Sequence, residues 1–238
     1  MLQPSNPTNL ADPYRKASPY DLTPAELGAV RQFAGGVYTA ANLPLPNNVP
    51  IGRVIQRADL NYSYWYSDGT WWRPHFAALI ARNTGSVATP LASMVLTGGV
   101  SQFLVTPTNP VVTIPAGLIP PQARLRVEAD FVRNAAGAGT LAATIFLGNA
   151  NTTSDPQLFS VSMTVANVSA WASASARLGT SRSTAVGSSV NYGGAGSQIY
   201  SDKACNFDAV SYINFGANSS GVAADTLALL SYRVWLED

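Results

Sequence analysis

The sequence predicts an all-β protein: a C-terminal antiparallel, jelly-roll-like β-sandwich, a small β-hairpin neck, and a proline-rich N-terminal arm that bears one short helix. In the C-terminal half, short β-prone runs bounded by Gly, Asn, Asp and Ser clusters recur every ~8 to 12 residues, as in sandwiches and barrels. An Asp-Gly pair stands between two aromatic runs, and prolines crowd the first residues. The sequence shows no internal repeat of the kind that indicates a parallel β-helix.

The composition favours a globular, β-rich protein. Of the 238 residues, 11% are charged and 47% hydrophobic, and the formal net charge is +1. The charged share is low, since charged residues make up about a quarter of an average protein. Because the chain is also nearly neutral, we expect no nucleic-acid partner. Disordered chains combine low hydrophobicity with high net charge, which this chain does not. Its length suffices for one domain of ordinary size plus an extension.

Several features exclude whole classes of site. Cys205 is the single cysteine and His75 the single histidine, so a disulfide within the chain and an imidazole pair for a metal are both excluded. We expect both residues to pack in the interior, and we expect no metal site and no cofactor. The segment MLQPSNPTNLADPYRK lacks the apolar region of a secretory signal. The longest apolar run, 76–81, is far below the ~20 residues that span a bilayer, so we expect a soluble, cytosolically made protein without membrane insertion.

Residues 1–49 form the predicted arm. They hold prolines at positions 4, 7, 13, 19, 24, 44 and 46, too many for a core sheet because proline cannot donate to a ladder. A helix is predicted over Thr23–Ala34, with Thr23 as N-cap, Pro24 at the first position and Glu26 in the capping-box position. Its apolar residues recur every three positions and a Gly-Gly pair ends it. Such a short helix is marginal alone, so it must dock on a partner or on its own C-terminal domain.

Residues 50–95 form the predicted neck and connector. In YWYSDGTWWRP, residues 64–74, the Asp68-Gly69 pair predicts a two-residue type I′ turn. Counting outward from this turn pairs Tyr66 with Trp71 on one face and Trp65 with Trp72 on the other, so both faces are aromatic. A core hairpin and a sugar-stacking platform are alternatives, but exposed apolar faces mark interaction sites. The predicted oligomer interface consists of the hairpin's aromatic residues, Tyr64, Trp65, Tyr66, Trp71 and Trp72.

Residues 96–238 form the predicted sandwich. Within Ala123–Arg133, the apolar residues Leu125, Val127, Ala129 and Phe131 alternate with the charged residues Arg124, Arg126, Glu128 and Asp130, so one face is core and the other meets solvent. Thr226–Leu236 is predicted to place Leu230, Tyr232, Val234 and Leu236 on its core face and Arg233 and Trp235 on the other. Further strands are predicted at 102–105, 111–114, 140–147, 157–165, 168–176, 183–190, 197–201 and 207–215. The apolar run 77–81 and the Gly/Ser/Thr/Pro stretch that follows it are predicted to connect the neck to this domain.

No catalytic residue is predicted, and we expect a binding protein rather than an enzyme. Glu128 and Asp130 form the one close carboxylate pair inside a predicted strand. A charge-compensated ladder with Arg124 and Arg126 explains them better than a glycosidase pair does. NYGGAGSQ, residues 191–198, lacks the lysine of a phosphate loop, and the sequence has no Gly-x-Ser-x-Gly nucleophile motif.

The predicted receptor site lies on loops of the sandwich. Loops carry most binding residues, and Tyr and Trp stack on sugars at a low cost in side-chain entropy. The glycines of 191–200 let the backbone approach a ligand. The candidate residues are Trp171, Tyr192 and Tyr200, with partial burial in the sandwich as the alternative.

The order of parts along the whole chain resembles that of fibre or spike proteins of tailed bacteriophages and related gene-transfer particles. The resemblance rests on the arm, on a Tyr-rich strand followed by Ser-Asp-Gly-Thr-x-Trp-Arg-Pro, residues 67–74, and on the Ala/Ser/Thr/Asn-rich β domain. It implies a virion protein assembled in the bacterial host cytoplasm. Residues 1–49 would bind other virion proteins, the neck would form a homotrimer, and the distal domain would bind host-surface glycan. A non-adhesive decoration or collar protein and a polysaccharide-degrading spike are the alternatives.

Overall fold

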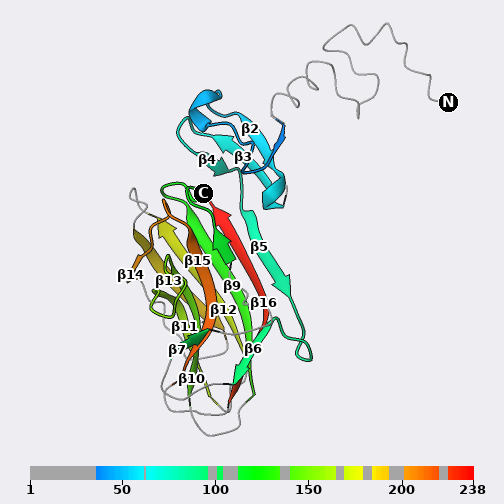
Figure 1. Ribbon diagram of the computed structural model, residues 1–238, viewed down its shortest axis with the longest axis vertical. Coiled ribbons are helices and arrows are strands. Elements are labelled where there is room, and N and C mark those ends of the chain that lie inside the picture. Colours follow the sequence, from blue (N-terminus) through cyan, green and yellow to red (C-terminus); the bar gives the residue numbers. More distant parts are fainter. Residues whose placement is uncertain are drawn as a thin grey trace, which may run out of the picture. The chain divides into compact units, whose positions relative to one another are not determined.

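A computed structural model describes residues 36–61, 63–95, 101–103, 112–134, 140–164, 169–178, 184–192, 201–219 and 225–238. The chain forms two compact units, Met1–Phe76 and Ala77–Asp238 (Figure 1). Apart from two short 3-10 helices, every regular element among these described residues is a β-strand, which confirms the all-β prediction. The helix predicted over Thr23–Ala34 and the arm up to residue 35 lie outside the described residues.

The first unit holds a four-stranded sheet. Its strand order is β1-β2-β3-β4, with β1 parallel to β2 and the other pairs antiparallel. The element bounds are β1 Val37–Tyr38, η2 Pro46–Asn48, β2 Val54–Arg57, η3 Ala58–Leu60, β3 Ser63–Ser67 and β4 Trp72–Pro74. Residues 36–49, predicted as arm, therefore belong to the neck unit. Pro44 and Pro46 lie outside its strands and contribute carbonyl acceptors to side chains of the hairpin.

The hairpin is two residues out of its predicted register. Ser67 pairs with Trp72, which leaves a four-residue loop between them. A type I′ turn needs positive φ at both central residues, and of the two only Gly69, at +92°, has it. The Asp68 side chain favours the longer loop, because its Oδ1 accepts the backbone N–H groups two and three residues further on, at 2.8 and 2.6 Å.

The second unit is an antiparallel β-sandwich of two sheets. One has seven strands in the order β14-β13-β12-β9-β16-β5, with β6 also paired to β16; the other has five in the order β11-β10-β15-β7, with β8 also paired to β15. The strand bounds are β5 Ala78–Thr84, β6 Ala92–Val95, β7 Ser101–Phe103, β8 Val112–Ile114, β9 Arg124–Asn134, β10 Leu141–Gly148, β11 Gln157–Met163, β12 Ser169–Leu178, β13 Thr184–Tyr192, β14 Ser201–Ala204, β15 Ser211–Ser219 and β16 Thr226–Glu237. Every strand predicted within 96–238 overlaps one of these.

Strands β5 and β6 correct the predicted domain boundary. Residues 77–95, predicted as a connector, extend the seven-stranded sheet: β5 pairs with the C-terminal half of β16 and β6 with its N-terminal half. The sandwich unit therefore begins at Ala77 rather than at residue 96. The signal in the sequence is weak because residues 79–84 of β5 are half-buried or exposed, so no clean alternation marks this edge strand.

The core lies between the two sheets, and β9 supplies its centre. Leu125, Val127, Ala129 and Phe131 are at most 1% exposed, as their alternation predicts. The residues between them face outward. The rings of Phe131 and Phe215, one from each sheet, lie 6.4 Å apart. Burying large apolar side chains of this kind contributes about 1.5–3 kcal/mol each.

A buried arginine, held by an ion pair within its own sheet, connects the two sheets through a hydrogen bond. Arg133 continues the inward positions of β9, and its side chain and that of Asp225, just before β16, are both 0% exposed. Arg133 Nε donates to Asp225 Oδ2 at 2.6 Å, and Arg133 Nη1 donates to the carbonyl of Met163 in β11 at 2.6 Å. A buried charge is costly unless it is paired and hydrogen-bonded, and here both conditions hold. The core at this end therefore depends on a polar contact that the sequence pattern did not reveal.

We expect Asp225→Asn to lower the free energy of unfolding by about 3–5 kcal/mol, because it leaves the Arg133 charge buried without its partner. Glu237→Gln is the control: Glu237 pairs with Arg126 at the surface, at 3.1 Å, and its loss costs at most about 1 kcal/mol. Urea denaturation of both variants measures the difference. A loss below 1 kcal/mol for Asp225→Asn would contradict the conclusion that the core at this end depends on the buried pair.

Candidate functional site

One aromatic face of the neck hairpin is buried within its own unit. Trp65 is 0% and Trp72 is 7% exposed. The Arg57 guanidinium lies 5.4 Å from the centre of the Trp65 ring, and Trp72 Nε1 donates to the Pro44 carbonyl at 2.8 Å. The prediction that these two tryptophans form an interface between chains is corrected, because the segment 44–57 of the same chain packs against them.

The opposite face of the hairpin is open. Tyr64 is 52% and Phe76 is 77% exposed, and Tyr66 is half-buried. His75 was expected to pack in the interior, but it is exposed, with its ring 6.3 Å from that of Tyr66 and 4.5 Å from that of Phe76. Of the five predicted interface residues, Tyr64, Tyr66 and the half-buried Trp71 are therefore the ones that reach the surface of this unit.

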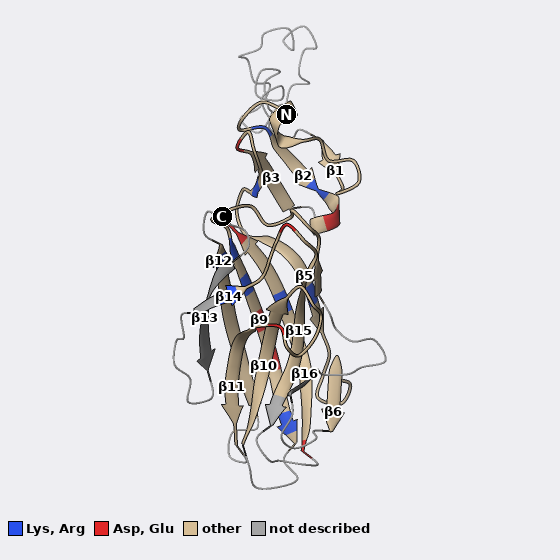
Figure 2. Cartoon of the chain, turned by 60° about the vertical axis from the view of Figure 1, so that its left-hand side comes forward, with Lys and Arg blue, Asp and Glu red and all other residues tan. Residues whose placement is uncertain are grey.

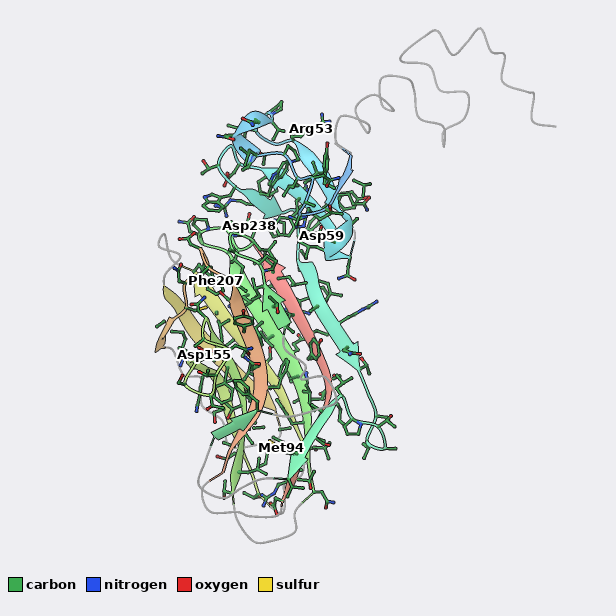
Figure 3. All side chains as sticks on the ribbon, in the orientation of Figure 1. Arg53, Asp59, Met94, Asp155, Phe207 and Asp238 are labelled. Atoms are coloured by element: carbon green, nitrogen blue, oxygen red, sulfur yellow. The ribbon has the colours of Figure 1, made fainter. Side chains whose placement is uncertain are left out.

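An ion pair stabilises the neck sheet on its β1 side. Arg57 Nε and Nη2 donate to Asp59 Oδ1 and Oδ2 at 2.8 and 2.7 Å, and Asp59 Oδ2 also accepts the N–H of Ala40 at 3.0 Å (Figure 3). The hydrogen bond from Arg57 lowers the pKa of Asp59, and burial only partly opposes it. The pair connects β2 to η3, and the hydrogen bond from Ala40 connects η3 to the turn after β1, so these contacts stabilise the sheet that carries the open aromatic face.

The second candidate surface is the outer face of the seven-stranded sheet. Acidic and basic segments lie next to each other on β9 (Figure 2). Each outward residue of β9 lies between one of β12 and one of β16, and cross-strand neighbours of this kind are within contact distance. The resulting rows are Trp171–Asp130–Ser231, Ser173–Glu128–Arg233, Ser175–Arg126–Trp235 and Arg177–Arg124–Glu237.

Two of these rows surround a hollow of about 250 Å³. Its lining consists of Glu128, Ala129, Asp130, Trp171, Ser231 and Arg233. It combines an aromatic ring, two carboxylates, a guanidinium and a hydroxyl, all held on three hydrogen-bonded strands. A few convergent polar groups beside an aromatic surface are typical of a site for a small ligand.

The hollow continues into a larger one of about 530 Å³, which shares Asp130, Trp171, Ser231 and Arg233. Its further lining residues are Thr84, Gly85, Phe131, Val132, Ser169, Ala170 and Leu230. The added residues carry no charge, and several are aliphatic. The site is therefore polar at one end and mostly apolar at the other.

A β-bulge in β16 shapes the apolar end. The register of β16 against β9 shifts between Leu229 and Ser231, which leaves Leu230 as the extra residue. Bulges re-aim side chains and are frequent beside functional sites. Leu230 was predicted on the core face; Leu227 and Leu229, both 0% exposed, hold those positions instead. The Leu230 carbonyl accepts the N–H of Gly85 at 2.6 Å, so the bulge connects to the end of β5.

Close packing requires a glycine at position 85. A Cβ there would lie 2.6 Å from the Thr89 carbonyl oxygen and 2.9 Å from the Leu91 nitrogen, both in backbone that could not move aside cheaply. The turn that brings these atoms near is closed by the Ser86 N–H, which donates to the Thr89 carbonyl at 3.0 Å. The wall of the hollow beside Leu230 is therefore formed by closely packed backbone atoms.

The remainder of the outer face is a compensated charge ladder, as predicted. Arg126 Nη1 lies 3.1 Å from Glu237 and its Nε 3.6 Å from Glu128, and its guanidinium is 5.7 Å from the centre of the Trp235 ring. Inside the hollow the Ser231 hydroxyl donates to the Asp130 carboxylate. Arg233 is exposed and belongs to none of the ion pairs among the described residues, so its guanidinium is available to a ligand.

Of the predicted receptor residues, the hollow contains Trp171, although Trp171 lies in strand β12 rather than on a loop. Tyr192 is the last residue of β13, and its Cα pairs with that of Trp171. Tyr200 lies outside the described residues. The sequence reading missed Ser231 and Arg233, although both occupy outward positions of the strand predicted over Thr226–Leu236.

A second polar cluster connects two loops of the sandwich by hydrogen bonds. Asn149 Nδ2 donates to the carbonyls of Asn206 and Val210 at 2.8 and 2.9 Å, and Asp155 accepts a backbone N–H of its own loop at 3.1 Å (Figure 3). Cys205 is buried beside it, as predicted, and burial raises the pKa of its thiol. The described residues hold no group of three or more His, Cys, Asp or Glu side chains suited to a metal. None of the helices in that part of the chain has the length and apolar character to cross a membrane.

No protein-family model and no curated protein matches the chain. Similar solved structures include lectin UEA-II complexed with galactose, at 10% identity and TM-score 0.35, covering 69% of this chain and 94% of that one. The lectin from Bauhinia forficata in complex with GalNAc matches at 10% identity and TM-score 0.32, over 66% and 98% of the two chains. The metal-free lectin I-B4 from Griffonia simplicifolia matches at 14% and 0.28, over 68% and 88%. Function is therefore inferred from the two surfaces themselves.

The neck is expected to lose stability in acid through Asp68. Burial raises the pKa of Asp68, but hydrogen bonds from Arg73 and from the N–H groups of Trp71 and Thr70 outweigh burial and lower the pKa. Because the folded-state pKa is the lower one, the carboxylate stabilises the hairpin above its unfolded-state pKa, and this contribution disappears as the pH falls through the folded-state value.

Asp68→Asn should therefore be less stable than the wild type at pH 7, by about 0.2–1 kcal/mol as for other partly exposed pairs. It should also lose less stability between pH 7 and pH 3. Denaturant titrations followed by tryptophan fluorescence at both pH values measure this difference. The same acid dependence in wild type and variant would contradict the assignment to Asp68.

Proposed function

We propose that this chain is a structural fibre or spike protein of a virion, homo-oligomeric, anchored through its N-terminal residues and adhering to host-surface glycan through its sandwich. The virion role is supported by the resemblance of the arm, the neck motif at residues 67–74 and the β domain to fibres of tailed phages and gene-transfer particles. Glycan binding is supported by the hollow on the outer face of the seven-stranded sheet.

The observation that carries glycan binding is the row Trp171–Asp130–Ser231 with Arg233 beside it. A sugar ring has an apolar C–H face and a rim of hydroxyl groups. An indole ring can contact the first, while a carboxylate, a guanidinium and a hydroxyl can hydrogen-bond to the second. Because paired strands fix the backbone of these residues, ligand binding requires no ordering of a loop.

The open aromatic face of the neck supports the homo-oligomer. Among the described residues of this small unit, the exposed large hydrophobic residues are Val37, Leu45, Ile51, Tyr64 and Phe76. Single exposed apolar residues are normal, whereas their concentration marks an interaction surface. A trimer with closed symmetry buries the same face of every copy and leaves none unsatisfied.

A polysaccharide-degrading spike is the second candidate, because Glu128 and Asp130 both line the hollow. Residues two apart on a strand share a face, with Cα atoms ~7 Å apart, which leaves room for a glycosidic bond between two carboxyl groups. Release of reducing sugar from a bound polysaccharide would favour this candidate. A decoration or collar protein would bind no glycan.

Trp171→Ala is expected to weaken glycan binding at least tenfold, about 1.4 kcal/mol, because the stacking surface is lost. An array of bacterial surface polysaccharides and inhibition of particle adsorption by purified protein measure the change. Trp235→Ala is the matched control, since Trp235 shares the outer face but lines neither hollow. If Trp235→Ala abolished binding and Trp171→Ala did not, the site would lie elsewhere on the face.

The double variant Tyr64→Ala, Tyr66→Ala is expected to weaken self-association by ~2 kcal/mol or more while the unit still folds. Trp65→Ala should instead destabilise the neck itself by about 3–5 kcal/mol, because Trp65 is core. Sedimentation velocity measures the first effect and thermal unfolding the second. A wild-type protein that sediments as a 25.0 kDa monomer at micromolar concentration would refute the oligomer.

A further inference from the structure

We infer that the hollow on the outer face of the seven-stranded sheet selects a neutral sugar carrying a methyl-bearing substituent, such as an acetamido, O-acetyl or 6-deoxy group. The inference rests on the proposed glycan-binding function and specifies which class of sugar the site takes. It follows from the change in chemistry along the hollow, from charged residues at one end to aliphatic residues at the other.

The polar end is formed by two successive rows. Glu128 and Arg233 face each other in one row, and Asp130 and Ser231 in the next. Successive outward rows of an antiparallel sheet lie ~7 Å apart. Donors and acceptors thus cover the length of one sugar ring, and Trp171 lies across Asp130 from Ser231 to provide the stacking face.

The apolar end begins at the next row along β9. Val132 is the outward residue beyond Asp130, and its neighbours in register are Ser169 and Ala228, so this row carries no charge. Leu230 and Val132 are half-buried, and both line the larger hollow. A substituent placed beyond the hydroxyl-binding row therefore meets aliphatic carbon and not a charged group.

The bulge makes this end concave. Leu230 is displaced from the β9 ladder, and its carbonyl bonds to Gly85 where β5 ends. Since the backbone of Thr89 and Leu91 already fills the space where a Cβ of residue 85 would lie, the wall cannot be rebuilt by a larger residue without displacement. The hollow thus has an aliphatic wall with a fixed backbone, against which a methyl group can pack.

The charges of the lining disfavour an acidic sugar. Glu128 lies 3.6 Å from Arg126 and is in register with Arg233, whereas Asp130 belongs to none of the ion pairs among the described residues. A ligand carboxylate or sulfate beside Asp130 would meet like charge in a partly desolvated site, where Coulomb repulsion is stronger than in water. The site therefore fits a neutral sugar, with its hydroxyl rim towards Asp130 and Arg233 and its methyl group towards Val132 and Leu230.

Isothermal titration of the full-length protein with monosaccharides tests the inference. The ligands compared are unsubstituted neutral hexoses, their N-acetylated 2-amino counterparts, an O-acetylated hexose, 6-deoxyhexoses and a hexuronic acid. Burying one methyl group contributes about 0.8 kcal/mol, so at least one methyl-bearing sugar should bind about fourfold tighter than its parent. The hexuronic acid should bind more weakly than the neutral hexose. The sugar whose affinity exceeds that of its parent by the largest factor identifies the substituent.

Two variants assign this preference to the apolar end. Leu230→Ala and the nearly isosteric Val132→Thr should each reduce the preference towards one while leaving the affinity for the parent hexose within twofold. Val210→Ala, at a residue that is 40% exposed and lines neither hollow, is the matched control and should change nothing.

Equal affinity for parent and methyl-bearing sugars would overturn the inference while leaving glycan binding intact. So would a preference that persists in both variants, or tighter binding of the uronic acid. If the wild type bound none of these sugars and no polysaccharide on the array, the proposed glycan-binding function itself would fail, and the inference with it.

Discussion

The whole sandwich depends on the two-residue period of β9. This strand is hydrogen-bonded along both edges, to β12 and to β16, so its inward residues form the middle of the core and its outward residues the middle of the hollow. A slip of one residue would exchange the two faces. It would bury Arg126, Glu128 and Asp130 without the solvent that hydrates them, a cost of several kcal/mol for each ionised group. Core and hollow are therefore specified by the same constraint.

Strand β16 adapts to that constraint through its bulge. On one side it follows β9 along its whole length; on the other its partner changes from β5 to β6. The extra residue at Leu230 accommodates the change, and the outer face loses its flat surface there. Beyond the bulge, Arg133 pairs with Asp225 and donates to the Met163 carbonyl of β11, and at the opposite end the ion pairs of Arg126 hold the outer side chains. The hollow thus lies between two regions that side-chain hydrogen bonds and ion pairs stabilise.

The parts of this fold that the sequence predicts are those with strict local patterns. Residues 124–131 alternate between charged and apolar side chains, and their strand and core face were predicted, whereas Val132 and Arg133 break the pattern. The neck hairpin was placed correctly, but its register depends on hydrogen bonds of the Asp68 side chain that propensity does not capture. The edge strand β5 escaped prediction because few of its side chains are buried. In the hollow, Trp171 was predicted as an aromatic candidate. Its polar companions could not be, since Asp130 and Ser231 meet across a separation of 101 residues that only strand pairing determines.

The separation of inward and outward residues on β9, β12 and β16 has an evolutionary consequence. Outward positions make no core contacts, so substitutions among them leave packing nearly unchanged while altering what the hollow can hold. Under the proposed adhesive function, single replacements at these positions would let the chain follow variation in host surface chemistry. Gly85 is the exception, because a side chain there would meet the backbone of Thr89 and Leu91. Drift in specificity should therefore begin at the charged rows and reach the aliphatic end last.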